Sequence, residues 1–426
     1  MIKLTTYIFA SILSVISVTA YGQLNNIEIA AITTDSNIDL DYTAGDTVKH
    51  QIFINQSITP KNKLLVFLPG TGGKPKDHYT EFCKTAANEG YHSIGLVYKN
   101  TISISDSCGT LANNGPNCSE DARMEIIYGT PLSPQVNVDS ANSIMNRLTK
   151  LLYYLESNYP TKGWDNYIDT TTMDIHWEKI ALAGHSQGGG HAALIARDTL
   201  VNRVLFFNCP SDRDTNLTTP LNQPQWFYDS HITPDSVYYA FYHEQNGGPE
   251  RLAIYNLFGL GNYGSQINVD TTSYPFNNHH ILYTDVATFD TVTYTNYFCN
   301  VGPALNPHSD IIVDCELPLD ISGNNAYEIV WQYMLNNNVS NVVSGITEQI
   351  ENISVTVFPN PTIGQFTIEG LSDNSTVRVY SSTGRLLKLF ENNSSIDLSP
   401  YSDGIYLIHI QVDDKYIIRK VVKKSA

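Results

Sequence analysis

Basic residues are scarce in this chain. Its 426 residues include 25 lysines and arginines against 42 aspartates and glutamates, which gives a formal net charge of −17 at pH 7. A nucleic-acid partner needs clustered basic side chains that can contact phosphates. The composition therefore argues against nucleic-acid binding and is typical of an acidic soluble protein.

Long apolar runs are also absent. The run from Tyr7 to Val18 follows Lys3 and is shorter than the roughly 20 residues that a membrane-spanning helix needs. Small residues, Ala20 and Gly22, stand three and one positions before a possible cleavage point. Residues 1–22 therefore read as a secretory signal peptide, the mature chain is expected to begin at Gln23, and no transmembrane segment is expected.

The chain has no C-x-x-C motif, which argues against a zinc site and against a thioredoxin-like redox role. Export permits disulfides, and six cysteines allow 15 pairings. No metal and no cofactor are expected. We predict disulfides between the cysteines that lie closest in sequence. These pairs are Cys108 with Cys118 and Cys299 with Cys315.

No repeat of 20 to 50 residues is present, which disfavours a solenoid or a propeller. The middle of the chain alternates apolar strand-like runs, such as "KLLVFLPG" and "KIALAGHS", with helical patterns, such as the one that Asp139 would cap. This alternation predicts a mostly parallel sheet with helices on both faces. Residues 23–338 are assigned to this domain and the polar residues 339–352 to a linker.

Residues 353–426 change to short alternating strands separated by turn residues, which predicts a small all-β sandwich. The motifs "FPNPTIGQFTIE", "VRVYSSTGRLLK", "IDLSPYSDGIYLIHI" and the terminal "RKVVKK" resemble the C-terminal sorting domain of the type IX secretion system of Bacteroidetes. The resemblance implies passage through the periplasm, contact with the type IX secretion machinery, and release or attachment at the outer-membrane surface. A carbohydrate-binding module is the alternative, but the segment contains no tryptophan.

The stretch "GHSQGG" places Ser186 between glycines at the spacing G-x-S-x-G. It follows a strand and opens a small-residue helix, which is the context that a serine nucleophile requires. With the earlier loop "VFLPGTGG", it makes the segment from about 61 to 338 resemble the α/β-hydrolase family. The resemblance implies an α/β-hydrolase fold and a Ser-His-acid triad without a metal.

The family's chain order is nucleophile, acid and histidine. His308, in the loop after the last strand, fits the base, and Glu244, at the end of "VYYAFYHE", fits the acid. Asp212 and Asp214 remain open as alternatives for the acid, while Asp285 reads as a structural residue. His279 and His280 are rivals of His308 at the start of the last strand.

The family resemblance also implies an oxyanion hole of two backbone N–H groups. One would come from Gln187, directly after the nucleophile, and the other from Thr71 in "PGTGG", with Gly72 as the alternative. The chain is therefore interpreted as an exported serine hydrolase, an esterase acting on a carboxylic ester. A secreted peptidase and a surface binding protein without activity are the alternatives.

Overall fold

The computed structural model describes residues 24–39, 42–43, 46–110, 115–215, 219, 223–286, 296–297, 306–320, 323–337, 355–371, 375–381, 386–391, 393–412 and 415–424. The predicted signal peptide and the predicted linker lie outside these residues.

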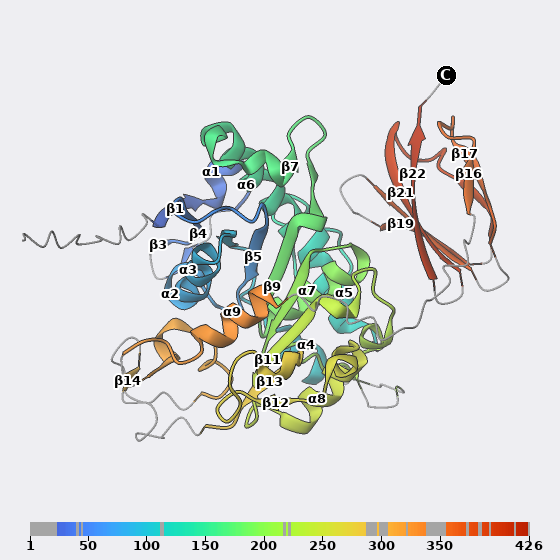
Figure 1. Ribbon diagram of the computed structural model, residues 1–426. Coiled ribbons are helices and arrows are strands. Elements are labelled where there is room, and N and C mark those ends of the chain that lie inside the picture. The colour runs from blue at the N-terminus through green and yellow to red at the C-terminus, as the bar shows by residue number, and fades with distance from the viewer. Residues whose placement is uncertain are drawn as a thin grey trace, which may run out of the picture.

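A nine-stranded sheet forms the centre of the larger part of the molecule (Figure 1). Six of its eight strand pairs are parallel, and the pairs β1–β4 and β4–β6 are antiparallel. In spatial order the strands are β1 (Leu24–Ala30), β4 (Lys49–Asn55), β6 (His92–Gly95), β5 (Leu64–Leu68), β9 (Ile180–His185), β10 (Arg203–Phe207), β11 (Tyr238–His243), β13 (Ile281–Thr284) and β12 (Ile267–Asn268).

This sheet corrects the predicted fold class. The sheet is mixed, and the structure does not show the α/β-hydrolase fold, so that prediction is wrong. Hydrophobic periodicity identifies strands but not their order or direction, which is why the sequence could not exclude the error. The finding that stands is a large, mostly parallel sheet followed by a β-sandwich-like region.

The two faces of the sheet are covered by different helices. In β5 all five residues are buried: Leu64, Val66 and Leu68 join one core, whereas Leu65 and Phe67 join the other, because successive side chains of a strand alternate. The first core includes α5 to α8, and the second includes α3 and α9. The helices are α1 (Ala31–Thr34), α2 (Pro75–His78), α3 (Thr80–Asn88), α4 (Ile104–Thr110), α5 (Cys118–Tyr128), α6 (Ile144–Asn158), α7 (Gln187–Asp198), α8 (Gly248–Leu257) and α9 (Glu328–Asn336).

The start of α6 differs from the prediction. Ser143 caps this helix, because its side chain accepts a hydrogen bond from the N–H of Asn146. Asp139 instead accepts from the N–H of Asn142, one turn earlier in the chain. The predicted cap is therefore wrong by about one helical turn.

The carboxyl ends of the parallel strands meet at one edge of the sheet. His185 at the end of β9 is paired in register with Phe207 of β10, and His243 of β11 is paired with Thr284 of β13. Loops that leave these strands therefore begin side by side, although they are far apart in the sequence.

The C-terminal part has its own core, built from buried residues between 355 and 421. Figure 1 shows its strands β16 to β22 as a group of arrows at the C-terminal end of the chain. It contains a three-stranded and a four-stranded antiparallel sheet. The strands are β16 (Thr356–Phe358), β17 (Gln365–Glu369), β20 (Ser395–Asp397), β19 (Leu386–Glu391), β18 (Thr376–Ser381), β21 (Gly404–Val412) and β22 (Lys415–Lys423).

Shorter elements complete the described structure. The strands are β2 (Tyr42–Thr43), β3 (Asp46–Thr47), β7 (Ile168–Asp169), β8 (Asp174–Ile175), β14 (Asn296–Tyr297) and β15 (Pro318–Leu319). The 3-10 helices are η1 (Pro160–Lys162), η2 (Trp164–Asn166), η3 (Trp177–Lys179), η4 (Gln225–Tyr228), η5 (Asp235–Val237), η6 (Leu260–Tyr263), η7 (Phe276–Asn278) and η8 (Asp314–Glu316).

Candidate active site

Ser186 forms the sharp turn between β9 and α7. Its φ of 53° and ψ of −121° put it in a region that residues with a Cβ rarely adopt. Its N–H donates to the carbonyl oxygen of Phe207, which ties the turn to the end of β10. The turn leaves Ser186 half-buried while both neighbours, His185 and Gln187, are buried.

The glycines around this turn are required by close backbone contacts. A Cβ on Gly184 would lie 2.4 Å from the carbonyl carbon of Gly188, and a Cβ on Gly188 would lie 1.9 Å from the carbonyl oxygen of Leu68. Real Cβ atoms do not approach backbone this closely. The motif therefore has a packing reason in this structure: β5, β9 and the start of α7 meet at Ser186.

His185 connects the loop after β5 to the loop that carries His308. Its Nε2 lies 2.8 Å from the carbonyl oxygen of His308, and its Nδ1 lies 3.0 Å from the hydroxyl of Tyr79. A carbonyl only accepts, so Nε2 carries the hydrogen and Nδ1 accepts from Tyr79. The Tyr79 oxygen in turn accepts from the N–H of Gly70 at 3.2 Å. Burial lowers the pKa of His185 to about 3, which keeps the ring neutral.

Asn208, directly after β10, holds the same loop from the other side. Its Nδ2 donates to the carbonyl oxygens of Pro307 and His308 at 3.0 and 2.9 Å. Its Oδ1 accepts from the N–H of His243 at 3.0 Å. The backbone of His308 is thus fixed by side chains from the ends of β9 and β10.

The His308 imidazole is oriented by an amide. Its Nδ1 lies 3.1 Å from Oδ1 of Asn246, and its ring centroid lies 4.7 Å from that of His185. Asn246 Oδ1 also accepts from the guanidinium of Arg251 at 3.2 Å, which fixes the orientation of the amide. Nδ1 of His308 therefore carries the hydrogen, and the lone pair of Nε2 is available to accept a proton.

Two effects keep His308 neutral. Burial is the larger one and the positive charge of Arg251 is the second, and together they lower the pKa of His308 to about 4. No hydrogen bond joins Ser186 to His308 within the described residues. Such contacts are often long in unliganded enzymes and shorten only when substrate binds.

The structure does not bring Glu244 to His308. The Glu244 carboxylate accepts from the hydroxyl of Tyr242 at 3.1 Å and packs over Gly248, where a Cβ would lie 2.5 Å from Oε1. Asn246, two residues further along the same loop, occupies the position that the sequence assigned to Glu244. The sequence argument required a carboxylate at this position, and the only signal of Asn246 in the sequence is its place in the loop after β11.

Asp212 and Asp214, the alternatives for the acid, hold α5 instead. Asp212 is fully buried and forms a bidentate ion pair with the buried Arg123, whose Nη1 donates to the carbonyl oxygen of Gln187 at 2.7 Å. Asp214 accepts from the N–H and hydroxyl of Ser119, each at 2.9 Å. Both carboxylates are therefore structural in this arrangement.

The remaining alternatives are His279, His280 and Asp285, and the contacts described for the two histidines are with residues other than Ser186. His280 is buried between the rings of Tyr239 and Tyr263, with centroids 4.0 and 4.3 Å away. His279 is half-buried, and its Nδ1 contacts the carbonyl oxygen of Ser265. Asp285 is also exposed and follows the end of β13, rather than lying inside that strand.

Two backbone N–H groups are available near Ser186. Gln187 is the first residue of α7, so its N–H has no acceptor within the helix. The Thr71 hydroxyl donates to Gln187 Oε1 at 3.1 Å, which places the loop after β5 against the start of α7. Gly72 already donates its N–H to the carbonyl oxygen of Asn100 at 2.9 Å, which favours Thr71 over Gly72 as the second donor.

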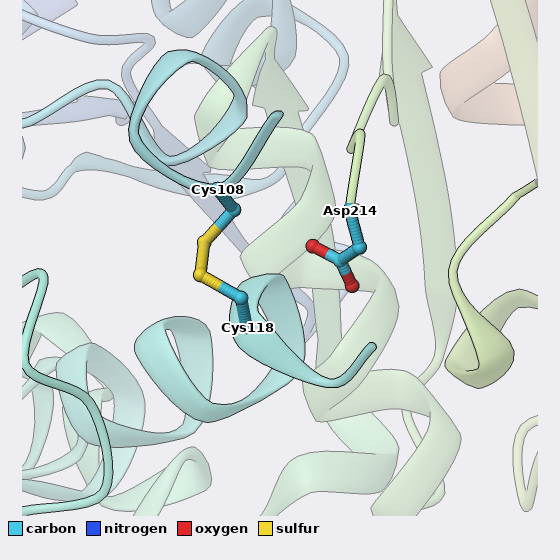
Figure 2. A group of neighbouring side chains, drawn as sticks. All are labelled: Cys108, Cys118 and Asp214. Atoms are coloured by element: carbon cyan, nitrogen blue, oxygen red, sulfur yellow. A yellow bond between two sulfur atoms is a disulfide. The ribbon is translucent and has the colours of Figure 1, made fainter. Parts of the chain in front are cut away.

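One disulfide is described, and it joins α4 to α5. Cys108 and Cys118 are bonded, which confirms that pairing, and Asp214 lies beside them (Figure 2). Cys315 is also disulfide-bonded, but its predicted partner Cys299 lies outside the described residues, and Cys83 and Cys209 are free and buried. Within the described chain, Cys108, Cys118 and Asp214 are the one group that could place three metal-ligand atoms within 4.8 Å of one another. Zinc binds thiolates, and here both sulfurs are consumed in the disulfide.

Comparison with known proteins identifies the C-terminal part of the chain. Residues 356–424 match the family described as the secretion system C-terminal sorting domain, which confirms the predicted type IX sorting domain. No curated protein matches the chain. The comparisons give no support to the resemblance of the preceding segment to the α/β-hydrolase family.

The sorting domain makes the chain a substrate of the type IX secretion machinery. The protein is therefore secreted or attached to the outer-membrane surface, as predicted. Within the described residues, no helix has both the length and the apolar character needed to cross a membrane.

Proposed function

We propose that this exported protein is a serine hydrolase that cleaves carboxylic esters. Ser186 is the nucleophile, His308 is the general base and acid, and Asn246 is the residue that orients His308. The proposal does not depend on a fold family, since the same constellation of groups occurs on unrelated folds.

The proposed reaction follows from the protonation of His308, whose Nδ1 carries the hydrogen and whose Nε2 has a lone pair. Nε2 of His308 accepts the proton of the Ser186 hydroxyl as Oγ bonds to the acyl carbon, and returns it to the alcohol as the ester C–O bond breaks. Water then gives a proton to Nε2 and attacks the acyl-enzyme, which releases the carboxylic acid and returns the proton to Ser186 Oγ. Nδ1–H of His308 remains bonded to Asn246 Oδ1 at 3.1 Å. A Cys-His-Asn arrangement in another class of protease shows that an amide can fill the orienting position.

The oxyanion of the tetrahedral intermediate would be stabilised by the N–H groups of Thr71 and Gln187. Such donors are effective because they are fixed before charge develops. The Gln187 side chain supports this arrangement, since its Oε1 accepts from both the Thr71 hydroxyl and the N–H of Ile104, each at 3.1 Å.

The observation that carries the proposal is the backbone of Ser186. Its positive φ, between a buried strand and the start of a helix, is a strained conformation that costs about 1–3 kcal/mol. A serine that served only as a turn residue could be replaced there by glycine without strain. The strain supports a requirement for the hydroxyl at this position.

The test is reaction with a fluorophosphonate probe followed by assays with 4-nitrophenyl esters of increasing acyl length. Ser186→Ala and His308→Ala should both abolish labelling and hydrolysis. Asn246→Ala should slow both reactions, whereas Glu244→Gln should leave them nearly unchanged. Full labelling of Ser186→Ala would contradict the assignment of the nucleophile.

A further inference from the structure

Arg251 is a buried cation beside the His308 loop. It lies in the first turn of α8 and is only 6% exposed. One of its terminal nitrogens donates to the carbonyl oxygen of Pro210 at 2.5 Å and the other to Asn246 Oδ1 at 3.2 Å. Its Nε is buried and has no hydrogen-bond partner among the residues that the structure describes.

No carboxylate neutralises this charge among the residues that the structure describes. Glu244, on the same loop, contacts Tyr242 and packs over Gly248 without an ion pair to Arg251. Glu250, next to Arg251 in sequence, lies 3.7 Å from Arg213 instead. A buried ion without a partner is costly, and proteins normally pair such a group or let it bind a ligand.

The position of this charge bears on the proposed reaction. When His308 accepts the serine proton it becomes a cation, and Asn246 has no charge to offset it. Arg251 brings a second positive charge to the same amide oxygen that His308 contacts. An anionic group on the substrate would offset both charges at the point where the reaction needs it.

We propose that the substrate carries a carboxylate on its acyl part, and that this carboxylate pairs with Arg251. The inference rests on the proposed function, because it names the substrate class of the same site. The buried Nε–H, which has no partner in the described part of the chain, and the Asn246-bound nitrogen are the two donors through which a guanidinium binds a carboxylate in bidentate fashion.

The experiment compares an anionic and a neutral ester, the mono-4-nitrophenyl ester of fumaric acid and its methyl-capped diester. The trans double bond keeps the carboxylate from attacking its own ester. The purified protein should hydrolyse the anionic ester with kcat/KM about 10- to 100-fold higher than the neutral one, which is the range for a charge-assisted hydrogen bond. Equal values, or a preference for the neutral ester, in a protein that reacts with a fluorophosphonate would overturn the proposal.

Variants separate charge recognition from the orientation of Asn246. Arg251→Gln should remove the preference for the anionic ester, and Arg251→Lys should keep part of it. A purely orienting role would slow both esters equally and leave their ratio unchanged. Arg213→Gln is the matched control, because it removes an arginine that is 70% exposed and should leave the ratio unaltered.

A binding measurement tests the anion site independently of hydrolysis. Monomethyl succinate should raise the Tm of Ser186→Ala but not that of a double variant with Arg251→Gln, since a ligand that binds only the folded state stabilises it. A shift without labelling would keep the anion site and reject the proposed function. The absence of any shift would reject the anion site, whatever the labelling result.

Discussion

His185 Nε2 donates to the carbonyl oxygen of His308 across 2.8 Å, although the two residues are 123 positions apart in the chain. The same imidazole accepts from Tyr79, which accepts from the Gly70 N–H. A single neutral ring therefore links the loop of the proposed oxyanion hole to the loop of the proposed base. In the proposed mechanism, the residue directly before the proposed nucleophile is a positioning residue.

Replacing His185 should slow the reaction of Ser186 without removing its hydroxyl. His185→Leu loses both hydrogen bonds and is expected to reduce the rate of fluorophosphonate labelling by about 10-fold or more, because small displacements in a site are costly. Tyr79→Phe keeps the ring packing and should have a smaller effect. Circular dichroism and Tm control for folding, and a labelling rate of His185→Leu equal to the parent's would contradict the positioning role.

The rate of fluorophosphonate labelling should fall only at an unusually low pH. Because the pKa of His308 is lowered from 6.5 to about 4, the imidazole is neutral, and able to accept a proton, at any pH above that value. The labelling rate should stay near its plateau at pH 5 and halve near pH 4. Folding is monitored at each pH by fluorescence, and a half-loss near pH 6.5 would show that burial and Arg251 do not have the inferred effect.

The Asp214 carboxyl should make the free energy of unfolding fall as pH rises. Burial raises the pKa of this carboxyl from 3.8 to about 7, so between these values the folded state binds a proton that the unfolded state releases. The favourable contribution is present below the lower value and is lost as pH rises through the upper one. Urea unfolding of Asp214→Asn should show a weaker pH dependence than the parent between these values, whereas the exposed Asp285→Asn should behave like the parent. Parallel curves for Asp214→Asn and the parent would contradict the prediction.

Breaking the Arg123–Asp212 pair should destabilise the fold strongly. Arg123→Met leaves a buried carboxylate without its partner and is expected to lower the free energy of unfolding by about 3–5 kcal/mol. The double variant Arg123→Met/Asp212→Asn removes both charges and should recover part of the loss. If the double variant is no more stable than the single one in urea unfolding, the penalty does not come from the unpaired charge.

The sequence predicted the export route correctly but not the arrangement of the fold, while the site residues stay a prediction. The sorting motifs are ordered and specific, and Ser186, between a strand and a small-residue helix, has the environment that its motif requires. The choice of His308 as the base rests on the expectation that the loops after parallel strands begin at one edge of the sheet. The order and direction of the strands depend on contacts between distant segments, which is why the fold class was wrong.

The orienting residue illustrates a second limit. Glu244 has the residue type expected from chemistry, but its side chain turns to Tyr242, whereas Asn246 reaches His308. Whether Glu244 or Asn246 contacts His308 depends on the backbone geometry of their loop, which the sequence does not give. The lack of an ion-pair partner for Arg251 in the described part of the chain is likewise invisible in sequence, because it depends on which side chains the fold brings together.

The most direct test of the central claim is mass spectrometry of the protein after reaction with a fluorophosphonate. The account predicts one adduct per chain, located on the peptide that contains Ser186 and absent from Ser186→Ala and His308→Ala. A well-folded protein that forms no adduct, or one that is modified equally in Ser186→Ala, would contradict the assignment of Ser186 as an activated nucleophile.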